Sequence, residues 1–326
     1  MNRQRGAALV IAMMVLALAA TLAVAVTSDY QLQLRRAQNH QTLEQAKQLL
    51  LGAEQLAMLA LKTDARSEEN AIDGGQDIWA QPPQPYPVDG GWMLGSVNDL
   101  QGRFNLNSLL VGLKDTQTEQ VTVPYTESQQ RFVKLLLSVP ELRLTRAQAI
   151  EITEAVIDWL DANQRPTGFG GKEDDYYMGE GLTYRTADRA MISASELRAV
   201  AGVNEELWQM LQPHVAALPE VEAGLNVNML TAPVLASLAP GDEPLALETA
   251  MLWVDELRAE PIEDLQIFVT DARWESPLQP EGLQLTSDFY QFSGQVKLGS
   301  SVLEMASVMY RKNEQPIVIQ RALGAL

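Results

Sequence analysis

The 326-residue sequence contains no cysteine and only two histidines. Disulfides, thiolate chemistry and zinc sites built from cysteine are therefore excluded, and little imidazole is available for catalysis or metal binding. Any metal site must use oxygen ligands, as a hard cation prefers. Because a chain without cysteine folds in either redox compartment, this absence does not decide where the protein resides.

Positive charge is also scarce. Lys and Arg number 24 against 42 Asp and Glu, which gives a formal net charge of −18. A surface with this charge repels polyanions, which argues against a nucleic-acid partner. The hydrophobic content of 46% can supply real cores, and a chain of this length suggests about two domains.

The amino terminus is the most informative segment. Met1–Gly6 carries Arg3 and Arg5, and residues 7–26 contain no charge and are interrupted only by Thr21. About 20 apolar residues at a rise of about 1.5 Å match a hydrocarbon core of about 30 Å, and flanking arginines stay on the cytoplasmic side. The sequence therefore predicts one membrane crossing, with the carboxyl-terminal part exported.

The helical pattern continues beyond this span. Apolar residues recur at steps of three and four from Leu43 to Ala60, and no proline occurs between Met1 and Gln81. We expect one helix of about 55 residues, about 80 Å long, with an apolar first half and an amphipathic second half. A cleaved secretory signal, with an A-x-A-like site around Val24, and a plain membrane anchor are the alternatives.

The exported part combines predicted strands with predicted helices. The proline-rich stretch 81–87 excludes a helix and suits an extended connector. Alternation and turn residues predict a strand pair in Trp92–Asn107 around a turn at residues 98–102. The same signals predict later strands at residues 265–270, 289–298, 302–310 and 316–322, the last three as a meander. Apolar periodicity predicts helices at residues 128–138, 145–160, 195–200 and 204–211, with Thr145 as an N-cap.

Two similar strings occur far apart in the chain. GRFNLNSLL occupies residues 102–110 and LNVNMLTAPVLASL occupies residues 225–238. Asparagines two residues apart share one face of an extended segment, and an apolar helix-like run follows each pair. We interpret these asparagines as residues that satisfy backbone groups at strand-to-helix junctions, not as catalytic residues: Asn105, Asn107, Asn226 and Asn228.

Residues 158–177, DWLDANQRPTGFGGKEDDYY, concentrate oxygen donors in a Gly/Pro loop. Calcium takes six to eight oxygens in flexible geometry, which this loop could supply if its glycines fold it back. The spacing does not fit an EF-hand, because Arg165 falls at position 5 and Pro166 replaces the glycine at position 6. On composition alone, a solvated acidic turn is the alternative interpretation.

These features resemble one family. The basic leader ending in Gly6, the apolar helix that follows at once, GRFNLN, the acidic segment and LNVN are similar to the minor pseudopilins of type II secretion systems, in the protein K branch. The resemblance covers essentially the whole chain. It implies an α+β fold in which a long, type IV pilin-like N-terminal α-helix packs on an antiparallel sheet, with a large inserted helical domain of the sterile-alpha-motif-like kind.

The resemblance also implies a domain plan. A leader peptide at residues 1–6 precedes the two halves of the long helix, and the insertion divides the pseudopilin β region in two. The expected segments after the leader are a transmembrane half at 7–26, an amphipathic half at 27–62, a first β part at 63–112, a helical domain with the calcium loop at 113–220, and a second β part at 221–326.

In this family the leader is cut after the glycine and the helix is retained. The resemblance implies cleavage between Gly6 and Ala7 by prepilin peptidase, with methylation of Ala7. Pilins generally carry Glu at the fifth mature position, whereas this chain has Ile11. An unpaired carboxylate in an apolar bundle is costly, so loss of the Glu fits a subunit at the tip of a filament.

The resemblance further implies a bound calcium ion and a set of partners. The expected ligands are Asp161, Asn163, Glu173 and Asp174, with Asp158 and Asp175 as further candidates. The implied function is a non-enzymatic cap of the pseudopilus tip, anchored once in the bacterial inner membrane with the carboxyl-terminal domain in the periplasm. The implied partners are other minor pseudopilins of the I and J type, prepilin peptidase and inner-membrane lipid.

Other functions are weighed on the same residues. No Ser/His/Asp or metal-histidine arrangement is present, which disfavours an enzyme. Residues 200–203 between two helices are similar to a helix-hairpin-helix, but the acidic surroundings oppose phosphate contact. A minor pilin of a type IV pilus, or a membrane-anchored periplasmic calcium-binding interaction protein, stays open as an alternative.

Overall fold

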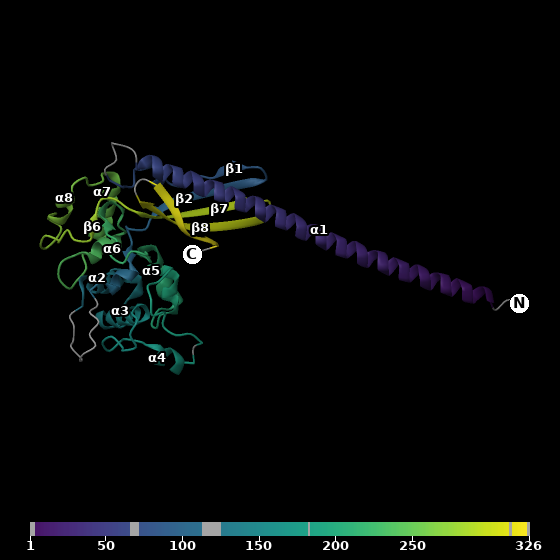
Figure 1. Ribbon diagram of the computed structural model, residues 1–326, viewed down its shortest axis with the longest axis horizontal. Helices are drawn as coiled ribbons and strands as arrows, with labels where there is room; N and C mark the ends of the chain where they lie inside the picture. Colours follow the sequence, from purple (N-terminus) through teal and green to yellow (C-terminus); the bar gives the residue numbers. More distant parts are fainter. Residues whose placement is uncertain (1–3, 66–71, 113–124, 182, 313–314, 325–326) are drawn as a thin grey trace.

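The structure is a computed structural model that describes residues 4–65, 72–112, 125–181, 183–312 and 315–324. A long helix, α1, projects from a head that contains a sheet and several shorter helices (Figure 1). The α-helices are α1 (Gln4–Asp64), α2 (Glu127–Leu137), α3 (Arg146–Leu160), α4 (Asp174–Gly179), α5 (Glu205–Leu211), α6 (Ala232–Ser237), α7 (Leu247–Ala259) and α8 (Leu265–Val269).

Short 3-10 helices and strands complete the chain. The 3-10 helices are η1 (Ile78–Ala80), η2 (Leu106–Leu110), η3 (Pro140–Leu142), η4 (Ala194–Ala199), η5 (Gln212–His214) and η6 (Val227–Met229). The strands are β1 (Tyr86–Val88), β2 (Gly91–Asp99), β3 (Phe104–Asn105), β4 (Val215–Ala216), β5 (Leu225–Asn226), β6 (Leu283–Gln284), β7 (Phe289–Leu298), β8 (Ser301–Lys312) and β9 (Gln315–Leu323).

Helix α1 has 61 residues and confirms the predicted single helix. Within residues 8–64, the most apolar window of 18 residues has a mean hydropathy of 2.8, and none of that window is buried. The second half instead buries one face of small and aliphatic side chains against the sheet: Ala46, Leu50, Ala57 and Leu61. The helix therefore changes from a rod suited to lipid into one layer of a folded head.

The main sheet is antiparallel with the strand order β1-β2-β7-β8-β9. Strands β7, β8 and β9 confirm the predicted meander, and a bulge interrupts the last pairing between Val308 and Met309. The face toward α1 contributes Tyr290, Phe292 and other apolar side chains to a core shared with the helix. The expected α+β fold, a long helix on an antiparallel sheet, is thus confirmed.

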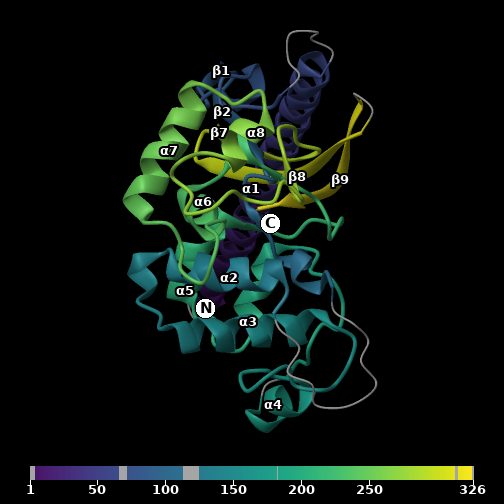
Figure 2. The same cartoon turned by 90° about the vertical axis from the view of Figure 1, so that its left-hand side faces the viewer.

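Helices α2 to α8 lie in the chain between β2 and β7. The expected bounds of the helical domain, 113–220, stay a prediction. Strands β3 to β6 form two separate parallel pairs, β3 with β4 and β5 with β6, outside the main sheet. These elements and the helices share one large core that includes Phe132 and Trp253. Figure 2 shows this part of the head beside the sheet.

One predicted strand pairing and one predicted strand are wrong. The expected strand pair in Trp92–Asn107 does not form, because β2 pairs with β1 and β7 while Phe104–Asn105 pairs with β4. Residues 265–270 form helix α8 instead of a strand, and the Asp264 carboxylate caps its start by accepting from the backbone N–H of Gln266 at 2.9 Å. A run of apolar residues this short does not distinguish a strand from a helix.

The asparagine pairs sit where the sequence predicted. Asn105 caps η2 by accepting from the backbone N–H of Asn107 at 3.2 Å, and Asn226 caps η6 by accepting from that of Asn228 at 3.0 Å. The second asparagine of each pair bonds both backbone groups of one distant residue, Met191 or Ile262. The structural interpretation of these residues is confirmed.

Candidate assembly helix, buried arginine and acidic loop

The side of α1 that faces away from the sheet carries no charge. We define the outer face of α1 as the exposed residues that recur at steps of three and four opposite the buried face: Leu34, Gln38, Gln41, Gln45, Gln48, Gly52, Leu56, Leu59 and Thr63. The charged residues between 27 and 64 all lie on other sides of the helix: Asp29, Arg35, Arg36, Glu44, Lys47, Glu54, Lys62 and Asp64.

Apolar side chains and an open glycine mark the part of the outer face beside the head. Leu56 is 60% exposed and Leu59 is 57% exposed, although Ala57 and Leu61, which point toward the sheet, are buried. Nothing lies within 4 Å of the position where a Cβ of Gly52 would be. Glycine inside a helix costs about 1 kcal/mol relative to alanine. Because Gly52 is exposed and has no side chain, another backbone can approach α1 closely at this position.

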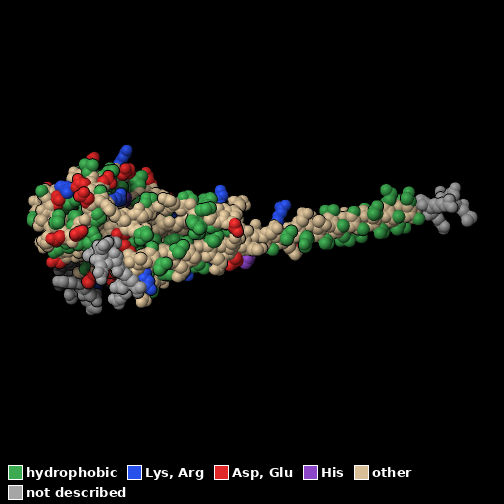
Figure 3. Space-filling model, turned by 90° about the horizontal axis from the view of Figure 1, so that it is seen from above, with side chains coloured by type: hydrophobic (Ala, Val, Ile, Leu, Met, Phe, Trp, Pro, Cys, Tyr) green, Lys and Arg blue, Asp and Glu red, His purple; other side chains and the backbone are tan. Residues whose placement is uncertain are grey.

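The outer face runs into the membrane half without a break in the helix. Figure 3 shows that half as a rod of green hydrophobic side chains among tan atoms, with no red or blue atoms on the visible side between the blue patch near the head and the grey end. Ile11, at the position where pilins carry Glu, is 63% exposed on this rod. A partner that covers the outer face would therefore leave the membrane along the same direction as α1.

A buried arginine joins the end of α1 to the segment that follows it and to the sheet. Arg311 on β8 is 9% exposed and pairs with Asp73 at 2.5 Å and with Asp64, the last residue of α1, at 3.1 Å. Its guanidinium also donates to the Ser287 carbonyl at 3.0 Å and lies 4.8 Å from the Tyr290 ring centroid. Burial raises the pKa of Asp73, although the charge of Arg311 opposes this shift.

The carboxylates around Arg311 have metal-like spacing. One oxygen from each of Asp64, Asp73 and Asp77 lies within 4.8 Å of the others. The positive charge among them is the Arg311 guanidinium, which pairs with two of the three. The cluster is therefore an ion-pair network that fastens three segments of the chain, not a metal centre.

The acidic loop gathers carboxylates around Glu173, which is the N-cap residue of α4. Glu173 is buried, and neither of its carboxylate oxygens has a hydrogen-bond partner. Burial, followed by the charges of Asp158, Asp161, Asp188 and Asp174, raises the pKa of Glu173 to about 8. A buried carboxylate without partners is costly unless a proton or a cation neutralises it.

Two of the predicted ligands, Asp158 and Asp161, lie near Glu173. Asp158, on the last turn of α3, has one oxygen that accepts from the backbone N–H of Thr167 at 2.9 Å and one buried oxygen, Oδ2, without a partner. Burial raises the pKa values of Asp158 and Asp161 to about 6. A Cβ at Gly171 would lie 2.4 Å from Asp158 Oδ2, so this loop position accepts only glycine.

Asp188 joins this group, and sequence reasoning missed it. Its φ of 50° lies in the left-handed region, which a non-glycine residue rarely adopts. Its carboxylate accepts from Thr186 Oγ1 at 2.6 Å and from Gln164 Nε2 at 3.1 Å. The sequence offered no signal for Asp188, because this residue lies beyond the acidic segment. It comes near Glu173 only because the chain reverses its direction after α4.

The other predicted ligands are placed less favourably. Asp174 accepts from the backbone and hydroxyl of Thr186 at 3.1 and 2.9 Å and pairs with Arg185 at 3.3 Å. The Asn163 side-chain oxygen accepts from the backbone N–H of Arg165 at 2.8 Å. Asp175 is exposed. The structure thus brings Asp158, Asp161 and Glu173 together and adds Asp188.

The donor set fits a hard cation. It consists of carboxylates alone, three of whose buried oxygens lack partners: Asp158 Oδ2 and both oxygens of Glu173. No three of these loop carboxylates have oxygens within 4.8 Å of one another, although all of them lie in the part of the chain that the structure describes. Binding would therefore draw them closer, with Glu173, Asp158, Asp161 and Asp188 as the residues that would hold the ion.

Comparisons with known proteins agree on one family. A family model described as type II secretion system protein K matches residues 102–220. The chain is 32% identical over 333 residues to type II secretion system protein K of Pectobacterium carotovorum, covering 99% of this chain and 97% of the relative. It is 36% identical over 230 residues to the protein of the same name from Aeromonas hydrophila, covering 70% and 68% of the two chains.

A solved structure has the same fold. A chain in the crystal structure of the GspK-GspI-GspJ complex from the enterotoxigenic Escherichia coli type 2 secretion system matches with a TM-score of 0.67 and 22% identity. The match covers 89% of this chain and 100% of that one. A shared fold alone does not show a shared family. Because the full-length relatives also match in sequence, this chain belongs to the type II secretion system protein K family.

Proposed function

We propose that this minor pseudopilin caps the tip of the pseudopilus and helps to initiate its assembly. The observation that carries the proposal is the uncharged outer face of α1, which continues from the membrane span into the head. A parallel helix from another membrane-anchored subunit fits this face, because it meets no charge along its length and can approach closely at Gly52. Other minor pseudopilins of the I and J type are the expected owners of such a helix.

The helical part of the head supports the capping role. Helices α2 to α5 project to the side of the α1 axis (Figure 1), and their core is continuous with that of α6 and α7. A subunit with so wide a head would clash with another added above it, whereas subunits can still join from the membrane side. The chain therefore acts by shape and contact, without catalysis.

The helix α1 is a single-pass anchor that fits the bacterial inner membrane, and we place the head in the periplasm. The short leader with Arg3 and Arg5 would stay cytoplasmic. Prepilin peptidase would cut between Gly6 and Ala7, which lie in the first turns of α1. Among the alternatives, the family assignment favours a secretion system over a type IV pilus.

We propose that the acidic loop holds a calcium ion. The support is chemical: buried carboxylate oxygens without partners, an all-oxygen donor set and a Glu173 pKa raised to about 8. The ion would supply positive charge that offsets the mutual repulsion of these carboxylates. Glu173 and Asp188 would then hold the end of the loop and the segment after α4 to the end of α3.

Site-specific crosslinking tests the assembly role, and the absence of native cysteine makes single-cysteine variants unambiguous. Leu56→Cys and Leu59→Cys, on the outer face, should form disulfides with single cysteines in the helix of an I- or J-type pseudopilin co-expressed in the same membrane. His40→Cys, also exposed but on another side of α1, is the control and should form none. Equal crosslinking from both sides of the helix would contradict the proposal.

A further inference from the structure

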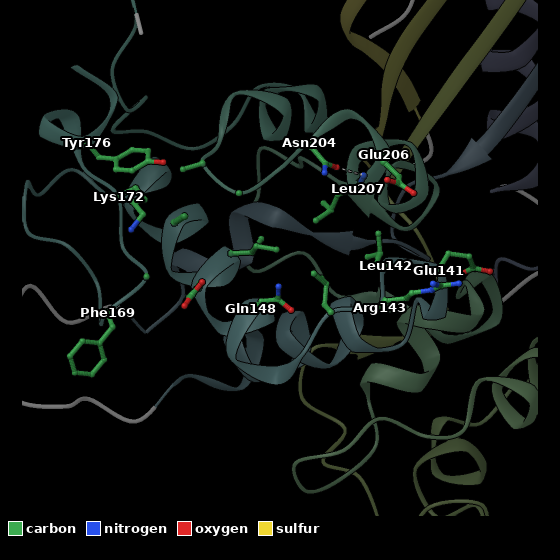
Figure 4. Close-up of a pocket in the computed structure, with 17 residues that line it drawn as sticks. Glu141, Leu142, Arg143, Gln148, Phe169, Lys172, Tyr176, Asn204, Glu206 and Leu207 are labelled. Atoms are coloured by element: carbon green, nitrogen blue, oxygen red, sulfur yellow. Dashed lines mark hydrogen bonds between the residues drawn. The ribbon is translucent and has the colours of Figure 1, made fainter. Parts of the chain in front are cut away.

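A groove crosses the helical part of the head, beside the acidic loop. Its volume is about 920 Å³, which is within the range of ligand sites in proteins. Four segments line it: η3 with the turn after it, helix α3, the acidic loop with α4, and the start of α5 with the turn before it. Figure 4 shows Phe169, Lys172 and Tyr176 at one end and Glu141, Arg143 and Glu206 toward the other, so the groove is elongated and open at its rims.

The groove has an apolar floor and rims of mixed charge, on which Glu141, Glu151 and Glu206 outnumber Arg143 and Lys172. Leu142, Ile152 and Leu207 contribute to the floor. Glu151 on the α3 side and Glu206 on the α5 side are exposed, and neither forms an ion pair within the described residues. An occupant gains most if it places apolar side chains on the floor and positive charges beside Glu151 and Glu206, away from Arg143 and Lys172.

One end of the groove carries an aromatic side chain with no cover. Phe169 is fully exposed, at 103% of its reference area, while the adjoining Gly170 is buried and its backbone N–H donates to the buried Glu154 carboxylate at 2.5 Å. Beside it, Lys172 Nζ lies 5.1 Å from the Tyr176 ring centroid. A phenylalanine presented by an anchored loop offers a contact for an apolar side chain of a partner.

We propose that this groove binds an extended peptide segment of a protein partner, one in which apolar side chains alternate with Lys or Arg. Alternating apolar and basic residues suit the groove, because an extended chain directs successive side chains to opposite sides. Apolar side chains would reach Leu142, Ile152 and Leu207, and the basic ones would reach Glu151 and Glu206. This binding surface is separate from the outer face of α1, so it goes beyond the assembly role.

The test uses the full chain in detergent with calcium held constant. The probe is a fluorescent ten-residue peptide of alternating Leu and Lys, followed by anisotropy. The variant Glu151→Lys/Glu206→Lys should weaken binding by about tenfold or more. The matched control, Glu275→Lys/Glu281→Lys, makes the same change in net charge at exposed glutamates that do not line the groove, and it should change the affinity by about twofold or less.

Two further arms separate specific binding from simple attraction to an acidic protein. A peptide with Ser in place of Leu keeps every charge and should lose most of the affinity. The Phe169→Ala variant should weaken binding of the Leu-Lys peptide several-fold with an unchanged thermal midpoint, because that side chain makes no contact in the free chain. Equal losses in the groove and control variants, or equal binding of the Ser peptide, would overturn the proposal.

Discussion

Replacing Arg311 with methionine should lower the free energy of unfolding of the head by about 3 to 5 kcal/mol, the usual cost of removing one partner from a buried ion pair. Methionine keeps the apolar stem, so the loss reports the charge and its bonds. The variant would leave Asp73 and Asp64 buried, 2% and 6% exposed, without the guanidinium that pairs with both. For a domain whose total stability is about 5 to 15 kcal/mol, this loss is a large fraction.

Urea unfolding followed by tryptophan fluorescence measures this effect. Arg146→Met is the matched control, because Arg146 pairs with Asp242 and Glu243 at 3.3 and 3.5 Å on the surface, where its side chain is 42% exposed. That variant should lose about 1 kcal/mol or less. If both variants lost the same small amount, Arg311 would not be the junction between α1 and the head.

Calcium should raise the thermal midpoint of the head by about 5 to 10 °C at about 100 times its Kd, since that excess contributes about 2.7 kcal/mol. The reason is that the ion would neutralise the carboxylate of Glu173 and would bind Asp158 Oδ2, which otherwise lack partners. Glu173→Gln and Asp188→Asn should each remove most of this increase, whereas Asp175→Asn, at an exposed position, should retain it. A calorimetric scan with and without a chelator gives the comparison.

The calcium effect should also depend on pH in a stated direction. The pKa of Glu173 is raised from 4.5 to about 8 by burial and neighbouring charges, so the folded chain holds a proton there that the unfolded chain releases. Without calcium, the contribution of Glu173 to the free energy of unfolding is therefore fully present below about pH 4.5 and falls as the pH rises toward 8. If calcium binds as proposed, it would bind the deprotonated carboxylates, so its stabilisation should grow over the same interval. A calcium effect that is constant from pH 5 to 8 would contradict this.

Long periodic elements were predictable from the sequence because many residues repeat the same signal. The 61-residue helix and the three-stranded meander follow from steps of three and four and from alternation. The five residues of α8 were not predictable in this way, since their apolar run is too short to show a period. Its N-cap, Asp264, was the available signal.

The residues of the candidate sites likewise differ in how far the sequence could predict them. Asp158, Asp161 and Glu173 come from one dense acidic segment, which composition marks as a possible calcium loop, and the family resemblance made them expected ligands. Asp188 comes from the chain beyond α4, and Arg311 meets Asp73 across 238 residues. Such contacts depend on how the head folds over α1, which local pattern does not encode. The outer face of α1 could be defined only once the buried face was known.

The central claim is that α1 is retained after removal of a six-residue leader and holds the head among parallel helices. The mass of the amino-terminal peptide, taken from the membrane fraction of cells that express prepilin peptidase, tests it most directly. We predict a peptide that begins at Ala7 and carries one added methyl group. A peptide that begins at Met1, or one that begins after Ala25 as a cleaved secretory signal would give, would contradict the account.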